Sequence, residues 1–234
     1  MKRAMQSVYR ATAQQTWDAI AESFDTTRNR PWEYCLQFIG SLKKTDIVAD
    51  LGCGNGRHLF PCAEHCSFVY GIDISSKLLR IVEKKIQTKS LHNVSLIHAD
   101  LVSLPFTDKS LSVVLCIASL HNIQGKINRR AALTEIARVL KPQGTALISV
   151  WSRWQDKFYK QFLSQSILHP LTVGDIDIYW KQHNLSVPRF YHLYSRGEFY
   201  RDLEGANLHI EHIKSLRIHS KRFPDNYFAV VQKR

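Results

Sequence analysis

Val48-Ala49-Asp50-Leu51-Gly52-Cys53-Gly54-Asn55-Gly56 is the stretch of this chain that decides the fold. An apolar run ends in an acid, and glycines then follow at positions 52, 54 and 56. Glycine tolerates positive φ and, because it lacks a side chain, lets backbone N–H groups approach a ligand closely. The stretch therefore predicts a strand, a tight ligand-binding turn and the start of a helix.

The spacing of these glycines separates the turn from the common dinucleotide-binding motif. It is G-x-G-x-G, whereas dinucleotide enzymes carry G-x-G-x-x-G, so the turn is not laid out for a pyrophosphate. Asp73 ends the next apolar run, Ser67–Ile72, about 20 residues after the turn, where a carboxylate can hold a ribose diol. The ligand that suits this pattern best is S-adenosyl-L-methionine.

Strand-like and helix-like segments alternate along the chain, which is typical of a parallel sheet with helices on both faces. We expect an α/β fold of the class I methyltransferase (Rossmann-like) type, with a seven-stranded, mostly parallel sheet in one domain, 1–234. Residues 1–46 form a predicted N-terminal helical extension, and 152–187 an insertion after the fifth strand, near the active site. The predicted strands are Ile47–Leu51, Ser67–Ile72, Val94–Ala99, Leu111–Ile117, Thr145–Trp151, and a closing antiparallel pair, Leu208–Ile218 and Asn226–Val231. The predicted helices are Arg57–His65, Lys77–Lys89, Asn128–Leu140 and one that opens at the capping box Ser195-Arg196-Gly197-Glu198.

The ends of the predicted strands supply the rest of the cofactor site. Asp100 follows the third strand, where a carboxylate can accept a hydrogen bond from an adenine amino group, with Leu101 at the ring edge. The fourth strand exits at the carboxyl edge of the sheet, where open α/β folds bind ligands. Trp17 and Phe24 are expected to close over the cofactor. The predicted cofactor-binding residues are Asp50, Gly52, Gly54, Asn55, Gly56, Asp73, Ile74, Asp100, Leu101, Ile117 and Ala118.

Composition bounds the class of protein. The 234 residues are 44% hydrophobic, enough for one good core, and no run approaches the ~18 apolar residues of a membrane span. We expect a cytoplasmic protein without a membrane partner, whose five cysteines are reduced thiols. Cys62, His65 and Cys66 follow His58 at helical spacing, but zinc ligands usually come from separate elements, so no metal is expected.

The charge points to a polyanionic partner. The formal net charge is +12, and Lys126 to Lys160 contains eight Lys/Arg against two Asp/Glu. The run Arg189-Phe190-Tyr191-His192-Leu193-Tyr194 mixes cationic and aromatic side chains. Such a run suits a splayed base with its phosphate, and it equally suits an edge strand of the core.

Several segments together also carry a family likeness. On them the chain resembles the tRNA wobble-uridine carboxymethyl methyltransferases, the family that includes the methyltransferase domain of the AlkB-homologue tRNA hydroxylase. The likeness runs from about Val8 to Val231, is weakest across 152–187, and departs from the family at Asn122, where a second histidine is usual. The segments are Phe24-Asp25-Thr26-Thr27-Arg28-Asn29-Arg30-Pro31-Trp32, the glycine turn, Ile117-Ala118-Ser119-Leu120-His121, Arg129-Arg130, and Arg189-Phe190-Tyr191-His192-Leu193-Tyr194-Ser195-Arg196-Gly197-Glu198.

The resemblance implies methyl transfer from S-adenosyl-L-methionine to the carboxylate of 5-carboxymethyluridine at the tRNA wobble position, giving the methyl ester. It implies two partners, the tRNA anticodon loop and a small zinc-ribbon activator subunit that forms a heterodimer with the methyltransferase. His121 and Arg28 are then expected beside the reacting group. The residues expected to contact the anticodon loop are Arg129, Arg130, Arg189, Tyr191, which would stack a flipped base, and His192.

Two other interpretations of the residues stay open. A class I methyltransferase acting on a small-molecule phenol or carboxylate would need the glycine turn and Asp73 equally, although not the basic segments. A non-catalytic RNA-binding relative would be expected to have a damaged cofactor turn, and this turn is intact. A carboxylate acceptor is already anionic at neutral pH, so the predicted enzyme needs no general base and depends on in-line placement.

Overall fold

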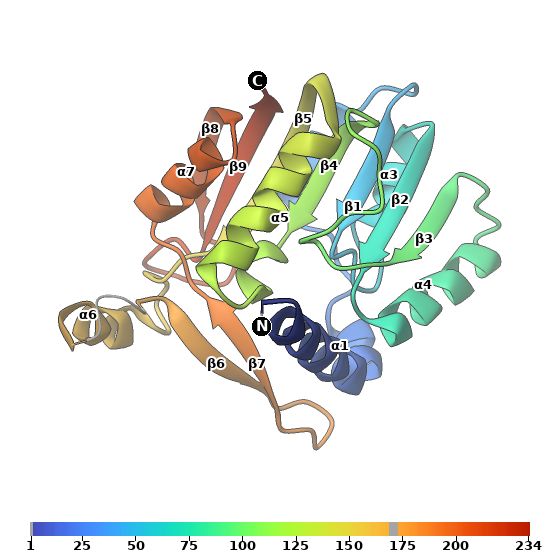
Figure 1. Ribbon diagram of the computed structural model, residues 1–234. Helices are drawn as coiled ribbons and strands as arrows, with labels where there is room; N and C mark the ends of the chain where they lie inside the picture. The colour runs from blue at the N-terminus through green and yellow to red at the C-terminus, as the bar shows by residue number, and fades with distance from the viewer. Residues whose placement is uncertain (1, 169–172) are drawn as a thin grey trace.

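A computed structural model describes residues 2–168 and 173–234, and it places side chains in 11–164 and 173–234. In this described part a seven-stranded sheet has the strand order β3-β2-β1-β4-β5-β9-β8 (Figure 1). The strands from β3 to β5 run parallel, whereas β9 pairs antiparallel with both β5 and β8. The predicted fold class is confirmed. The strands are β1 (Ile47–Leu51), β2 (Phe68–Asp73), β3 (Val94–His98), β4 (Leu111–Ile117), β5 (Leu140–Trp151), β8 (Leu208–Leu216) and β9 (Asn226–Lys233).

One strand begins earlier than its pattern predicts. β5 starts at Leu140 and not at Thr145, because Leu140 pairs with Leu111 of β4. The register then shifts before Val113 pairs with Thr145, and Gln143 takes a φ of 63° within the irregularity. Local sequence there reads as the end of a helix, and the long-range pairing with β4 overrides it.

Helices cover both faces of the sheet and build a core on each. Cys35 of α2, Cys62 of α3 and Val82 of α4 pack with the side chains of one face. Leu133 of α5 and Phe199 of α7 pack with those of the other. The helices are α1 (Lys2–Thr27), α2 (Glu33–Gly40), α3 (Leu59–His65), α4 (Ser76–Thr88), α5 (Lys126–Val139), α6 (Tyr159–Leu168) and α7 (Arg196–Gly205), with a 3-10 turn at Leu120–Asn122.

The N-terminal helix and the insertion meet beside the carboxyl ends of the parallel strands (Figure 1). The insertion contributes α6 and the first strand of an antiparallel hairpin, β6 (Asp175–Trp180) and β7 (Val187–His192). Ser23 of α1 ties to this hairpin: its hydroxyl accepts a hydrogen bond from Trp180 Nε1 at 2.9 Å and pairs with His183 Nδ1 at 2.8 Å. Residues 169–172 of the predicted insertion lie outside the described residues.

The opposite side of α1 is anchored to α4. Asp18 accepts hydrogen bonds from the Ser75 hydroxyl at 2.6 Å and from the Lys77 backbone N–H at 3.0 Å. A carboxylate at the first turn of α4 satisfies backbone donors that the helix leaves unpaired and complements its dipole. These contacts hold α1 across the edge of the sheet where the strands end.

The helix predicted to open at Ser195 is present, with one of the two hydrogen bonds of a capping box, while the Glu198 carboxylate binds Arg153 and His192. The Ser195 hydroxyl accepts a hydrogen bond from the Glu198 backbone N–H at 3.2 Å, and α7 runs from Arg196 to Gly205. The helix buries Phe199 completely against the sheet, whereas the neighbouring Tyr200 is 43% exposed.

We expect Phe199→Ala to lower the free energy of unfolding by about 3–5 kcal/mol, because it leaves a cavity in the core. Tyr200→Ala, one residue along the same helix, should change it by about 0.5 kcal/mol or less. Urea unfolding followed by circular dichroism measures both. Equal effects of the two substitutions would show that α7 does not pack as described.

Candidate active site

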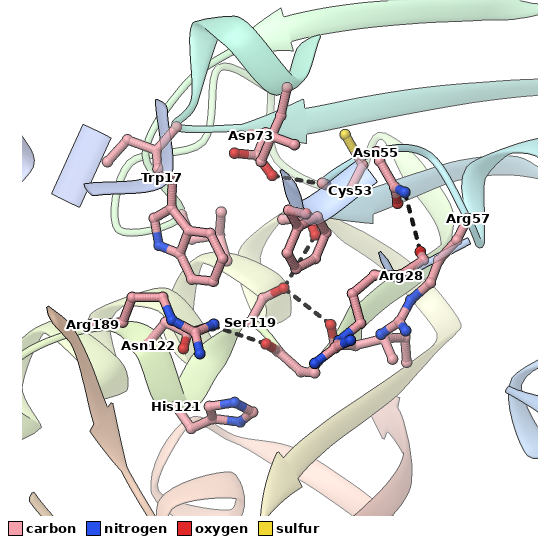
Figure 2. A pocket seen from close by; sticks show the side chains of 18 of the residues that line it. Trp17, Arg28, Cys53, Asn55, Arg57, Asp73, Ser119, His121, Asn122 and Arg189 are labelled. Carbon is pink, nitrogen blue, oxygen red and sulfur yellow. Dashed lines mark hydrogen bonds between the residues drawn. The ribbon is translucent and has the colours of Figure 1, made fainter. Parts of the chain in front are cut away.

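A cavity opens at the carboxyl edge of the sheet, between the turn after β1, the exit of β4, α1 and β7 (Figure 2). It encloses about 1290 Å³ of empty space, part of it open to solvent. The predicted site residues that line it are Arg28, Gly52, Gly54, Asn55, Asp73, Ile74, Asp100, Leu101, Ile117, Ala118, His121, Arg189 and Tyr191, and Trp17 and Phe24 line it too.

The glycine turn brings backbone to the cavity wall. Gly52 has a φ of 71°, and a Cβ at this position would lie 2.2 Å from the Ser119 hydroxyl oxygen. The same hydroxyl donates a hydrogen bond to the Gly52 carbonyl at 3.2 Å. Only glycine therefore allows β1 and the exit of β4 to meet this closely.

Asp73 fixes the other side of the turn. Its carboxylate accepts hydrogen bonds from the backbone N–H groups of Gly54 and Ser75, each at 2.8 Å. Burial raises the pKa of this carboxyl, and the backbone hydrogen bonds oppose that rise. The side chain thus stands at the cavity in a fixed orientation, with lone pairs left over for a ligand.

Asp50 and Gly56 support the turn from outside the cavity lining. Asp50 is 2% exposed, and its Oδ2 has no hydrogen-bond partner in the described part of the chain. Burial raises the pKa of Asp50 to about 7, against the attraction of the nearby Arg57. Gly56 has a φ of 84°, and a Cβ there would lie 2.7 Å from the ring of Phe60.

His121 lies on the side of the cavity away from Asp73 (Figure 2). Its Nδ1 accepts a hydrogen bond from the Trp151 backbone N–H at 3.1 Å, and its ring stacks on Tyr191 at 5.4 Å. Burial, with His192 and Arg189 nearby, lowers its pKa to about 3. The imidazole is therefore neutral at physiological pH and carries its proton on Nε2, as a hydrogen-bond donor.

Two arginines share this side of the cavity with aromatic rings. The Arg189 guanidinium lies 4.8 Å from the ring of Trp180 and 5.1 Å from that of Tyr191, and it is only 7% exposed. Arg28 lies 5.3 Å from Trp180 as well. No acid in the described ranges pairs with either arginine, and Arg189 Nε has no hydrogen-bond partner there. Aromatic faces and unpaired cations make this end receptive to an anion.

The remaining predicted substrate residues lie away from the cavity. Arg129 is buried and donates to the Ile123 carbonyl at 3.2 Å. His192 is buried between two carboxylates, Asp175 at 2.6 Å and Glu198 at 2.9 Å. Burial places both out of direct reach of an RNA. Arg130 stays exposed while it pairs with Asp202 at 2.8 Å.

Tyr191 does not offer a face for a flipped base. Its side chain is 2% exposed, and its ring stacks on Trp151 at 4.9 Å and on His121, with Arg189 over it. The interpretation that a base stacks on this ring is therefore not supported. Tyr191 is a wall of the cavity.

Some residues at or beside the cavity are missing from the predicted site. Trp151 ends a predicted strand at the carboxyl edge of the sheet, so the rule that located His121 also applies to it. Arg57 follows the glycine turn directly. His219 comes from the loop after β8, and Trp180 reaches the arginines from the insertion, so both depend on long-range packing.

Comparison with known proteins agrees with this geometry. Residues 49–148 match the family model described as "Methyltransferase domain". A methyltransferase of Methanosarcina mazei that depends on S-adenosylmethionine has a TM-score of 0.72 at 20% identity, covering 87% of this chain and 98% of that one. Residues 49–148 thus match a methyltransferase domain, and the chain has the class I methyltransferase fold. The predicted cofactor is thereby confirmed.

The curated relatives agree with the family likeness at the level of this domain. The chain is 36% identical over 140 residues to the tRNA (carboxymethyluridine(34)-5-O)-methyltransferase of Arabidopsis thaliana, covering 60% of this chain and 32% of that protein. It is 34% identical over 142 residues to the ALKBH8 enzyme of the same name from Macaca fascicularis, covering 61% of this chain and 20% of that one. The chain thus spans a third or less of the length of these two relatives.

The residues of the methyltransferase domain fit the cofactor chemically. Backbone at Gly52 and Gly54, the oriented Asp73 carboxylate and Asp100 lie around one cavity, as a nucleoside with a free diol and an amino group requires. Asn122 also lines the cavity, and its buried Oδ1 has no hydrogen-bond partner in the described residues. Such an orphaned acceptor is costly unless a ligand satisfies it.

The described residues hold neither a candidate metal site nor a membrane-spanning helix. They contain no group of three or more His, Cys, Asp or Glu that could hold a metal ion. All five cysteines, Cys62 and Cys66 included, are buried as free thiols. None of the described helices has both the length and the apolar character needed to cross a bilayer.

Asp73→Ala is expected to weaken binding of S-adenosyl-L-methionine at least about tenfold, since a hydrogen bond to a charged group contributes roughly 1.5–3 kcal/mol. Asp177→Ala, an exposed acid of β6, is the matched control and should leave that affinity unchanged. Titration calorimetry measures both, and circular dichroism confirms that each variant is folded. An affinity within twofold of the parent for Asp73→Ala would remove this carboxylate from the cofactor site.

The buried carboxyl of Asp50 predicts a pH effect on stability. Its pKa is about 7 in the folded chain and about 4 in the unfolded chain, so between these values only the folded chain keeps the proton. Folding stability should therefore fall as pH rises from about 4 to about 7. Asp50→Asn has no such proton, so its advantage over the parent should grow from about pH 5 to about pH 7 in urea unfolding. The control is Asp177→Asn, whose difference in free energy of unfolding from the parent should not change with pH. The same constant difference for Asp50→Asn would contradict the raised pKa.

Proposed function

We propose that this chain transfers the methyl group of S-adenosyl-L-methionine to the carboxylate of 5-carboxymethyluridine at the wobble position of tRNA, forming the methyl ester. The names of the curated relatives support this acceptor. The observation that carries the proposal is the chemistry at the end of the cavity formed by His121, Arg28 and Arg189, which we call the acceptor end. It offers a neutral hydrogen-bond donor and unpaired cations, and its buried histidines are not free to act as bases.

Two buried histidines line the cavity, and both accept from backbone. His121 Nδ1 accepts from Trp151, and His58 Nε2 accepts a 3.4 Å hydrogen bond from the Trp32 N–H. Burial lowers the pKa of each well below its usual value. A phenol has a pKa near 10 and needs a base, whereas a carboxylate with a pKa near 4 is already a nucleophile. Neither buried histidine supplies such a base, and this favours a carboxylate acceptor over the small-molecule phenol.

The residues then have distinct tasks. The bound cofactor supplies an electrophilic methyl group. Arg189 and Arg28 attract the acceptor carboxylate, and the His121 Nε2–H donates to one of its oxygens, which leaves the other oxygen free to attack. Trp17, Phe24 and the hairpin exclude water around the reacting atoms. Placement of this kind contributes roughly 7–11 kcal/mol in well-aligned cases.

The partners belong to the same proposal. A chain in the complex between the Haloferax volcanii Trm112 methyltransferase activator and a methyltransferase matches this fold with a TM-score of 0.69 at 19% identity, covering 94% of this chain and 96% of that one. We therefore propose that this chain works as a heterodimer with a small zinc-ribbon activator, on tRNA, in the cytoplasm. The net charge of +12 favours the RNA partner.

The fold alone leaves the reaction open. A [4+2]-cyclase, SpnF, matches with a TM-score of 0.71 at 14% identity, covering 94% of each chain. The assay that decides incubates the chain, with and without the activator, with methyl-labelled cofactor and total tRNA. Label that enters tRNA and is released by mild alkali identifies an ester. Cofactor uptake without labelled tRNA would overturn the proposal and leave a small-molecule enzyme or a non-catalytic relative.

Arg189→Gln is expected to lower kcat/KM for the carboxymethylated RNA about 10- to 100-fold, because a charged hydrogen bond of roughly 1.5–3 kcal/mol is lost. Affinity for S-adenosyl-L-methionine should stay within twofold. The control is Arg196→Gln, an exposed arginine at the start of α7, which should leave both quantities unchanged. The opposite pattern, lost cofactor affinity with RNA turnover intact, would move Arg189 to the cofactor side.

A further inference from the structure

A basic segment lies at the mouth of the cavity, in the connection between β8 and β9. From His212 to Pro224 the chain contains four Lys/Arg and no acid. We call residues 217–222 the basic loop. Its charged side chains are exposed, and they are Arg217, Lys221 and Arg222, with His219 between them.

Two carboxylates order this loop through its backbone. Asp225 accepts from the N–H groups of Ile218, His219 and Ser220 at 2.6–2.9 Å. Asp156, in the connection after β5, accepts from the N–H groups of the next three residues, 221–223, at 2.8–3.0 Å. The carboxylates thus bind backbone rather than the basic side chains. Arg217 donates to the Lys221 carbonyl at 3.1 Å and Arg222 lies over the ring of Phe223, yet all three basic side chains remain exposed to a ligand.

The loop continues the wall of the methyltransferase cavity. His219 lines that cavity and also lines a second cavity that lies against the loop. Trp151 is likewise shared between the two. Lys157 and Lys221 both line the second cavity, one from the connection after β5 and one from the loop. A polymer with one unit in the main cavity would therefore run its next units across the basic loop.

We infer that the basic loop, with Lys157, binds the phosphodiester backbone of the RNA strand beside the methylated nucleotide. This inference rests on the proposed function, and it assigns phosphate binding to a segment other than the one that contains Arg129 and Arg130. Exposed lysine and arginine side chains suit phosphates, and a loop ordered before binding loses little entropy when it binds. These contacts do not depend on the base sequence, because phosphate groups carry no sequence information.

The test measures RNA affinity against salt concentration. Lys221→Gln combined with Arg222→Gln removes two charges and keeps the backbone N–H groups that Asp156 binds. Lys43→Gln combined with Lys109→Gln is the matched control, since these exposed lysines precede β1 and β4 at the opposite edge of the sheet. The probe is an anticodon stem-loop RNA that contains 5-carboxymethyluridine, with the activator present in every arm.

We expect the loop variant to bind this RNA about tenfold more weakly at ~50 mM salt, with the slope of log K against log salt reduced by about 1.4, which is two contacts at ~0.7 each. Cofactor affinity should not change, and the control pair should match the parent in every measurement. If the loop variant binds RNA as tightly as the control pair does, the inference is overturned. The proposed function still stands in that case, provided that the parent methylates the RNA. A parent that binds cofactor but neither binds nor methylates RNA overturns both.

Discussion

The approach of the β1 turn to the exit of β4 is the contact on which the rest of the site depends. It is possible because Gly52 has no Cβ, so the Ser119 hydroxyl can lie against its backbone and donate to its carbonyl. The same closeness brings the β4 exit, with Ala118 at a φ of 54°, into one cavity with Asp73 from the neighbouring strand. Strained backbone of this kind is retained where surrounding structure holds it, commonly at functional sites.

The cavity is completed by segments that the sheet does not itself position. α1 lies across the strand ends because Asp18 binds the start of α4 and because Asp25 pairs with Lys85 of the same helix. Asn55 of the glycine turn donates to the Arg28 carbonyl at 3.1 Å, which sets the end of α1 against the cofactor side. Ser23 then joins α1 to the hairpin that contains Arg189. Acceptor and cofactor ends are thus coupled through one helix.

Sequence patterns predict the parts of this arrangement that arise locally or from strand order. The glycine turn, Asp73 and His121 follow from residue type and from the rule that ligands bind at the carboxyl edge of a parallel sheet. Arg189 is noticeable as part of a cationic and aromatic run, but Arg129 in a basic segment is equally noticeable and is buried against Ile123. Charge composition cannot separate these two cases, because only tertiary packing decides which arginine faces a cavity. Sequence patterns do not predict Trp180 and His219 as site residues for the same reason.

The surroundings of Arg189 suit a reaction in which charge disappears. A sulfonium and a carboxylate both lose charge as the methyl group moves, so a tight ion pair to the carboxylate would stabilise the ground state more than the transition state. Arg189 instead lies among Trp17, Trp180 and Tyr191, whose ring faces attract the guanidinium. Burial lowers the pKa of Arg189, yet an arginine stays protonated in proteins, so the cation persists. An arginine held by rings still attracts an anion into the cavity. Because the rings already balance part of its charge, it loses less favourable electrostatic energy when the methyl transfer neutralises that anion.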